Sequence, residues 1–168
     1  EIQACLVSHA HFDHSKAMKD LSLRGIPIYA SAGTYEALDL LPEATEEVSS
    51  YRIAKAGVVI EIGNYKVLPF EVVHDHPFMP CKEPLGFLIQ HETGKLVYIT
   101  DTRYSLGMFK DITHYMIECN HSEVLIEQSL QRGTINKALY DRIRLTHFAL
   151  EQVKEFFKAT DLTKCREI

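Results

Sequence analysis

The first part of the chain alternates short apolar runs with longer helical patterns. Ala4–Val7 is an apolar run that ends at a cluster of histidines, so we predict a buried strand that leads into a loop. Ser15–Leu23 has helical composition and stops before Gly25, a residue type that commonly terminates helices. Ile26–Ala30 is predicted to be a second strand and Thr34–Leu41 a second helix. The pattern therefore predicts a strand–loop–helix–strand–helix unit.

The pattern then changes to that of β-structure and finally to that of helices. Gly63-Asn64 is a two-residue hairpin signal between two apolar stretches, and Gly94 lies in the turn between two more. The predicted strands are Val58–Ile62, Tyr65–Val73, Gly86–Gln90, Lys95–Thr100 and Met116–Cys119. The predicted helices that follow are Ser122–Gln131, Ile135–Arg144 and Ala149–Lys158. This order favours a layered α/β domain in which helices pack on sheets.

The composition is that of a globular protein. Of 168 residues, 46% are hydrophobic and 24% are charged, and the net charge of −5 gives no general attraction to nucleic acid. Bound divalent cations would reverse the local field, so an anionic substrate stays open. No apolar run approaches the ~20 residues of a membrane span, so we expect no membrane partner and a cytoplasmic protein. The four cysteines form no C-x-x-C pair and are expected to be free thiols.

Residues 8–14, Ser-His-Ala-His-Phe-Asp-His, bring four potential metal ligands together directly after the first predicted strand. Imidazole and carboxylate groups hold zinc and similar ions in hydrolytic sites. A loop at the end of a strand can direct His9 and His11 to one position, and Asp13 and His14 to a neighbouring one. Two cations about 4 Å apart would share a bridging hydroxide suited to attack on a phosphoryl or carbonyl centre. A chance polar loop is the alternative, and a complete H-x-H-x-D-H string argues against it.

This string resembles the signature of the metallo-β-lactamase superfamily, which implies an αββα sandwich. Phe70–Asp75 is similar to the family's third motif, a strand that ends in a metal-binding histidine. Val97–Thr102 is similar to its fourth, a strand that ends in the aspartate that bridges both metals. The resemblance implies that one metal is held by His9, His11 and His74, and the other by Asp13, His14 and Asp101.

Two alternatives remain for these ligands. His76 lies on the same side of an extended chain as His74 and can be the ligand instead, although His74 is favoured because it directly ends the apolar run. Asp101 can be a turn former, and its place behind Leu-Val-Tyr-Ile-Thr favours the metal role.

Two stretches of the final third resemble the phosphodiesterase side of the superfamily, near ribonuclease Z and a related bacterial and phage branch of exonuclease-like proteins. They are Ile117–His121 and Arg142–Ala149. The resemblance implies that His147 is the general acid on the leaving oxygen and that Glu118 orients it. His147 as a helix-entry residue is the alternative, and His121 is left as an outer-sphere or helix N-terminal residue.

Basic side chains gather in the same region. Arg132, Lys137, Arg142 and Arg144 can contact phosphates near His147 or form a solvated helix face, which is the simpler interpretation.

The family's fifth motif, a histidine at the end of a final strand, has no counterpart after His147. The chain also begins on an apolar stretch, so we expect residues 1–168 to be a partial metallo-β-lactamase-like domain that is truncated at both ends. The oligomeric state is not predicted.

The leading hypothesis is a metal-dependent phosphodiesterase, with nucleic acid as a candidate substrate. Two divalent ions, Zn²⁺ by preference and Mn²⁺ as the alternative, would hold a bridging hydroxide, Asp13 would orient it and His147 would protonate the departing oxygen. The alternatives are an acyl hydrolase acting on a lactone, thioester or β-lactam, and a catalytically silent metal-binding module. A di-iron oxygen-reducing protein is disfavoured because His11 stands where such proteins usually carry glutamate.

Overall fold

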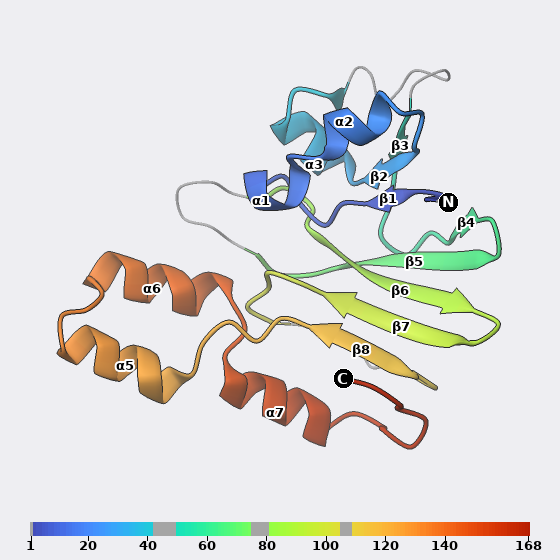
Figure 1. Ribbon diagram of the computed structural model, residues 1–168. Coiled ribbons are helices and arrows are strands. Elements are labelled where there is room, and N and C mark those ends of the chain that lie inside the picture. The colour runs from blue at the N-terminus through green and yellow to red at the C-terminus, as the bar shows by residue number, and fades with distance from the viewer. Residues whose placement is uncertain (1, 42–49, 75–80, 105–108) are drawn as a thin grey trace. The chain divides into compact units, whose positions relative to one another are not determined.

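The computed structural model describes residues 2–41, 50–74, 81–104 and 109–168, and the chain divides into two compact units. Unit 1 comprises Glu1–Glu71 and Cys81–Thr93, and unit 2 comprises Val72–Pro80 and Gly94–Ile168. Figure 1 shows both units as mixed α/β structure. None of the described helices combines the length and the apolar character that crossing a membrane requires.

Unit 1 begins with a parallel sheet of three short strands in the order β1 (Cys5–Leu6), β2 (Ile28–Ala30) and β3 (Tyr51–Ile53). The first two were predicted, whereas β3 was not. Helices α2 (Met18–Ser22) and α3 (Ala32–Ala37) belong to the same unit. Its buried core consists of Val7, Met18, Ile28, Ala30, Tyr35 and Tyr51.

The helix predicted over Ser15–Leu23 is instead two short helices, α1 (Phe12–Ser15) and α2. The Ser15 hydroxyl lies 3.0 Å from both the Ala10 and the His11 carbonyl oxygens and donates to them. A serine that bonds back to the carbonyl four residues earlier bends helices. The break places α1 directly after the histidines, as one tight turn.

The second part of unit 1 is an antiparallel set of three strands, β4 (Ile60–Ile62), β5 (Tyr65–Glu71) and β6 (Leu85–His91). The predicted two-residue hairpin is present, since Ile62 pairs with Tyr65 around Gly63-Asn64. Gly63 has a φ of +54°, a conformation that glycine adopts without steric cost.

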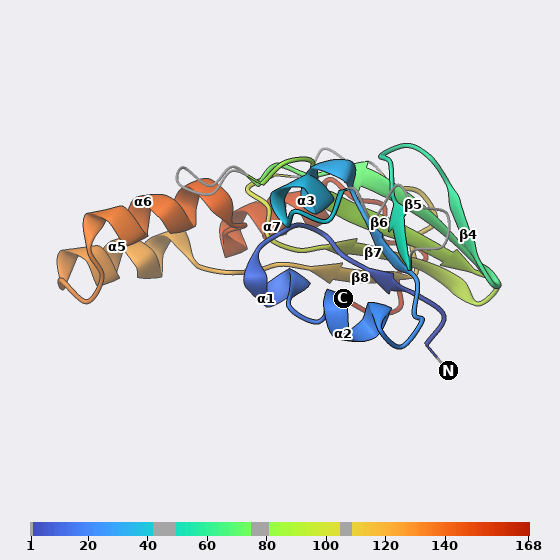
Figure 2. The same ribbon diagram turned by 90° about the horizontal axis from the view of Figure 1, so that it is seen from above.

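Unit 2 contains two parallel strands, β7 (Gly94–Ile99) and β8 (His114–Ile117), and three helices, α5 (Glu123–Gln131), α6 (Lys137–Thr146) and α7 (Leu150–Lys158). The three helices confirm the predicted ones to within a few residues. Helices α5 and α6 lie side by side as an antiparallel hairpin in Figures 1 and 2. Asn136 caps the N-terminus of α6, since its side chain accepts a hydrogen bond from the Leu139 backbone N–H at 2.8 Å.

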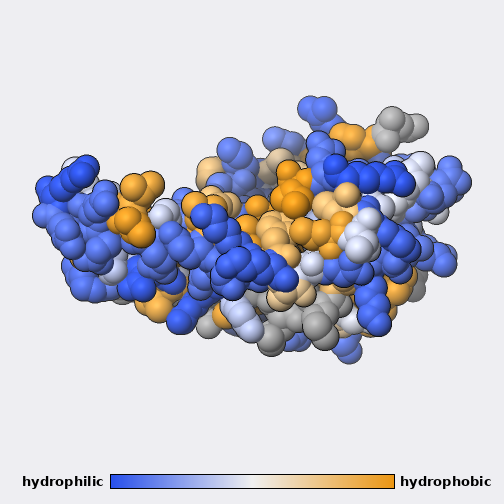
Figure 3. Space-filling view, turned by 90° about the horizontal axis from the view of Figure 1, so that it is seen from below, coloured by the Kyte–Doolittle hydropathy of each residue, from blue (hydrophilic) through white to orange (hydrophobic). Residues whose placement is uncertain are grey.

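The face of unit 2 that carries β8 is covered by aromatic side chains of α7. The buried Tyr115 ring packs edge-on against Phe156 and Phe157, with ring centroids 6.2 and 5.4 Å away. Beyond α7 the chain returns to β8, where the Tyr115 backbone N–H donates to the Glu167 carbonyl at 3.0 Å. The α5–α6 hairpin, at the left of Figure 3, has a mostly hydrophilic surface with isolated hydrophobic spots, and Val124 and Leu125 are its most exposed apolar residues.

Candidate metal centre

The histidine cluster of unit 1 starts after the end of β1, and a serine contacts its first histidine. His9 is only 1% exposed, and its Nδ1 lies 3.0 Å from the buried Ser8 hydroxyl. Its other nitrogen, Nε2, lies 3.1 Å from Nδ1 of His11. Two imidazole nitrogens at this separation are placed as neighbouring ligands of one cation would be. The Ser8 contact fixes which edge of the His9 ring is presented to His11.

Helix α1 carries the other two predicted ligands of this cluster. The His14 ring lies 4.2 Å from the His9 ring between centroids, and its Nε2 is 3.5 Å from a carboxylate oxygen of Asp13. The Asp13 side chain is 77% exposed, whereas that of His14 is 20% exposed. Unit 1 thus brings the four side chains of the string into one region, with Asp13 at its solvent edge.

Cys81 joins this cluster, which the sequence did not predict. Its Sγ lies 3.3 Å from Nε2 and 3.9 Å from Nδ1 of His11. Donor atoms of His9, His11 and Cys81 all lie within 4.8 Å of one another. Nitrogen and sulfur donors suit Zn²⁺ and similar ions, so this donor set fits a metal. Cys81 is a free thiol, as predicted, but its position beside the histidines was not predicted.

In unit 2, His74 is 2% exposed and its orientation is fixed by the backbone of helix α6. Its Nδ1 lies 2.9 Å from the Thr146 carbonyl oxygen. A carbonyl only accepts, so Nδ1 carries the proton and Nε2 carries the lone pair. That Nε2 lies 4.0 Å from a carboxylate oxygen of Asp101. The alternative ligand His76 lies outside the described residues.

Asp101 has an unusual backbone conformation, with a φ of +28°. Non-glycine residues with positive φ are strained and cluster at functional sites. The conformation is held by the neighbouring Thr102, which is fully buried and whose hydroxyl donates to the Val73 carbonyl at 3.0 Å. The Thr100 hydroxyl donates to the Asp101 carboxylate at 3.1 Å. The strand-end aspartate is therefore displayed at a fixed position beside His74.

Glu118 and His147 form a hydrogen-bonded pair in the same unit. His147 Nδ1 donates to one oxygen of Glu118, while the other oxygen accepts the backbone N–H groups of Thr102 at 3.0 Å and Phe148 at 3.1 Å. The Glu118 side chain is 9% exposed and that of His147 is 20% exposed. Donor atoms of Asp101, Glu118 and His147 lie within 4.8 Å of one another. The Asp101 carboxylate thus belongs to the same cluster as the Glu118–His147 pair.

The charge of Glu118 controls the protonation of His147. Burial lowers the pKa of this imidazole, but the hydrogen bond and the charge of Glu118, helped by Asp101, raise the pKa by more, so the net change is upward. Arg142 opposes them and lowers the pKa of His147. The net effect of these groups is to favour the imidazolium form of His147 more than in a free histidine.

The basic residues of this region divide into two groups. Arg144 bonds to Glu123 at 2.7 Å, and Lys137 pairs with Asp141 on the same helix. Both side chains are paired with carboxylates, in agreement with the simpler interpretation of a solvated helix face. Arg142 is exposed and lies close enough to His147 to influence the pKa of that imidazole.

The comparisons with known proteins agree with these motifs. The family model of the beta-lactamase superfamily domain matches residues 1–163, and the chain belongs to this family. It is 31% identical over 109 residues to a protein named ribonuclease J of Sinorhizobium meliloti (strain Sm2011 / Rm2011 / 2011), a match that covers 62% of this chain and 18% of that protein.

Two solved structures share the fold. The structure of Zn²⁺-bound PqqB from Methylobacterium extorquens superposes with a TM-score of 0.64 at 16% identity, over 88% of this chain and 54% of that one. A diphosphatase from the PhnP family gives a TM-score of 0.59 at 16% identity, over 93% and 55%. The predicted fold class, the metallo-β-lactamase fold, is confirmed, and the chain spans about half the length of these structures.

Replacing Glu118 by glutamine should lower the pKa of His147, because the amide keeps the shape of the side chain but removes its charge. The measurement is an NMR titration of the histidine side chains in metal-free protein. Glu127→Gln is the matched control, since Glu127 bonds to Tyr140 and does not contribute to the shift of His147. An unchanged pKa of His147 in Glu118→Gln would contradict the described pair.

Proposed function

We propose that this chain is a metal-dependent hydrolase that cleaves phosphodiesters, with nucleic acid as its substrate class. The observation that carries the proposal is the Glu118–His147 pair beside Asp101. The alkoxide that leaves a phosphodiester needs a proton, and a histidine with a raised pKa and a fixed orientation supplies one. Acyl substrates with good leaving groups need this help less, so the pair favours phosphodiesters over lactones, thioesters and β-lactams.

The proposed ligands are those that the family resemblance implies. His9, His11 and His74 would hold one divalent cation, and Asp13, His14 and Asp101 a second. When bound, such ions polarise the phosphoryl group and lower the pKa of water. Zn²⁺ is favoured over Mn²⁺ because most of these donors are imidazoles.

The side chains then have separate tasks. Asp13, at the solvent edge of the histidine cluster, would orient the attacking water. His147 holds its Nδ1 proton against Glu118, which leaves the Nε2 proton for the departing oxygen. Glu118 acts as a positioning residue, because it fixes the tautomer of His147 and stabilises its charged form. Arg142, exposed and near His147, is placed to contact a phosphate.

The names of two similar proteins support this substrate class. One similar protein is named a ribonuclease and one similar structure a diphosphatase, and both names refer to reactions at phosphorus. The ribonuclease is matched over 18% of its length, so its activity comes to this chain as a proposal.

His11→Ala and Asp101→Ala should each abolish metal-dependent cleavage of bis(p-nitrophenyl) phosphate, because each removes a ligand. The release of p-nitrophenolate by Zn²⁺- or Mn²⁺-loaded protein is the measurement. His91→Ala is the matched control, since His91 stacks on Tyr65 at the far end of β6 from Leu85. Unchanged turnover in both ligand variants would end the proposal, and turnover of a lactone or thioester alone would favour the acyl hydrolase.

Replacing His147 by alanine should have an effect that depends on the leaving group. With an RNA oligonucleotide, whose leaving oxygen is an alkoxide, the loss of a general acid should lower kcat by about 10²–10⁴-fold. With bis(p-nitrophenyl) phosphate the loss should be much smaller, because p-nitrophenolate leaves without a proton. Equal losses on both substrates would show that His147 has no role as an acid.

A further inference from the structure

The thiol of Cys81 lies where a further ligand of the His9–His11 cation would lie. Three atoms define the position: Nε2 of His9, Nδ1 of His11 and Sγ of Cys81. Nδ1 of His11 is 3.1 Å from the nitrogen of His9 and 3.9 Å from the sulfur of Cys81. All three residues belong to unit 1.

These separations match those of a zinc site. Zn–N distances of about 2.0–2.1 Å and a Zn–S distance of about 2.3 Å in a tetrahedron place two nitrogens about 3.3 Å apart and nitrogen and sulfur about 3.6 Å apart. The observed distances of 3.1 and 3.9 Å differ from these by only a few tenths of an ångström. Both separations that involve Nδ1 of His11 are thus close to those of a tetrahedral site, and all three donor atoms lie within 4.8 Å of one another.

The surroundings of the cluster also favour coordination. The Ser8 hydroxyl contacts Nδ1 of His9, the nitrogen that points away from His11. Metal-binding histidines usually have an outer-sphere partner of this kind. Cys81 directly precedes the segment that pairs with this loop, since the Leu85 backbone N–H donates to the Ser8 carbonyl at 2.8 Å. The backbone four residues after Cys81 is thus bonded to the loop that carries the histidines.

We propose that Cys81 binds, as a thiolate, the cation that His9 and His11 hold. The inference rests on the proposed metal centre and extends its ligand set beyond the histidines and carboxylates that the family resemblance implies. A soft sulfur ligand selects Zn²⁺ over the harder Mn²⁺. Cys81 therefore sets the metal preference of this chain.

Cobalt substitution tests this ligand directly. Co²⁺ added to the metal-free full chain should give visible d–d bands together with a near-ultraviolet thiolate-to-cobalt charge-transfer band. Cys81→Ser should lose the charge-transfer band and keep the visible bands, and competition between Zn²⁺ and Mn²⁺ should shift towards Mn²⁺. Cys165→Ser is the matched control and should keep both bands, because the Cys165 thiol donates to the Glu167 carbonyl instead.

The outcomes separate this inference from the proposed function. Visible bands without a charge-transfer band in the unmodified chain would overturn the thiolate ligand and leave the histidine centre intact. If the folded protein binds no Co²⁺, both the thiolate ligand and the histidine centre are overturned. If Cys81→Ser fails to fold, Cys81→Ala and the spectrum of the unmodified chain decide the question.

A second feature, independent of Cys81, is the buried imidazole of His121 in unit 2. Its side chain is 7% exposed, and neither ring nitrogen has a hydrogen-bond partner within the part of the chain that the structure describes. A carboxylate oxygen of Glu123 lies 4.0 Å from Nε2. Buried polar groups without partners are destabilising and therefore call for an explanation.

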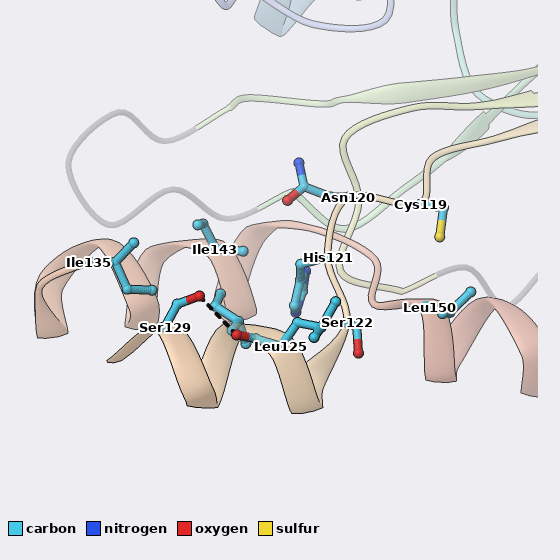
Figure 4. A pocket seen from close by; sticks show the side chains of 10 residues that line it. Cys119, Asn120, His121, Ser122, Leu125, Ser129, Ile135, Ile143 and Leu150 are labelled. Carbon is cyan, nitrogen blue, oxygen red and sulfur yellow. Dashed lines mark hydrogen bonds between the residues drawn. The ribbon is translucent and has the colours of Figure 1, made fainter. Parts of the chain in front are cut away.

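The imidazole of His121 projects into a cavity of about 500 Å³ between α5 and α6 (Figure 4). The cavity walls are mainly aliphatic and include Leu125, Ile135, Ile143 and Leu150. Its size falls within the range of small-ligand sites, which are mostly apolar with a few polar groups that orient the ligand. Burial lowers the pKa of His121, so its ring is neutral at pH 7 and offers one donor and one acceptor.

The cavity is joined to the chain segments that carry the proposed acid. Cys119, in its wall, follows Glu118 directly, and the Leu150 backbone N–H donates to the His121 carbonyl at 2.7 Å. We infer that the cavity holds a planar heteroaromatic ring, a nucleobase of the substrate, and that a shift of the His121 ring, whose nitrogens are buried, lets the polar edge of the base bond to it. This second inference also rests on the proposed function, because it requires a nucleic-acid substrate.

Binding of adenosine 5′-monophosphate to the metal-loaded full chain tests the cavity. Nucleotide should shift the side-chain ¹⁵N signals of His121, and ribose 5-phosphate, which lacks a base, should not. His121→Phe should weaken nucleotide binding, and His91→Phe should not. His121→Gln keeps a donor and an acceptor, so it should restore part of the nucleotide binding that His121→Phe loses.

Equal responses to both probes, or none to either, would overturn the base-binding site. Cleavage of bis(p-nitrophenyl) phosphate is measured separately, so a failure here is distinguishable from a failure of the proposed function.

Discussion

One mostly buried carboxylate connects several segments of unit 2. Glu118 stands at the end of β8 and accepts hydrogen bonds from Thr102, which follows β7, and from His147 and Phe148, which join α6 to α7. Hydrogen bonds to a charged acceptor are about twice as strong as neutral ones, so three donors on one carboxylate hold these segments firmly. The carboxylate therefore fixes the position and the protonation of His147 at once.

Three histidines, His9, His74 and His147, each have their Nδ1 atom fixed by a neighbouring group. Ser8 contacts Nδ1 of His9, the Thr146 carbonyl accepts from Nδ1 of His74, and Glu118 accepts from Nδ1 of His147. The other nitrogen of each ring then has a defined direction. Preorganisation of this kind removes the need to reorient rings when a cation or a substrate arrives.

The sequence predicted most of the candidate site because its strongest signal is local. Four ligands within residues 8–14 are recognisable as a string, and hairpins such as Gly63-Asn64 have their own short signature. Cys81 could not be predicted, because 70 residues separate it from His11 and no periodicity links them. Strand β3 was missed because Tyr51-Arg52-Ile53 lacks the continuous apolar run that marked β1 and β2 in the sequence. The support from Thr146 is a backbone carbonyl, which no side-chain pattern encodes.

The Thr146–His147 peptide has a consequence of its own. The carbonyl of Thr146 orients His74, and the next residue along is His147. A tilt or unwinding at the end of α6 would therefore disturb both His74, the proposed ligand, and His147, the proposed acid. A partner or a long substrate that bound the α5–α6 hairpin and moved the end of α6 would displace both groups together.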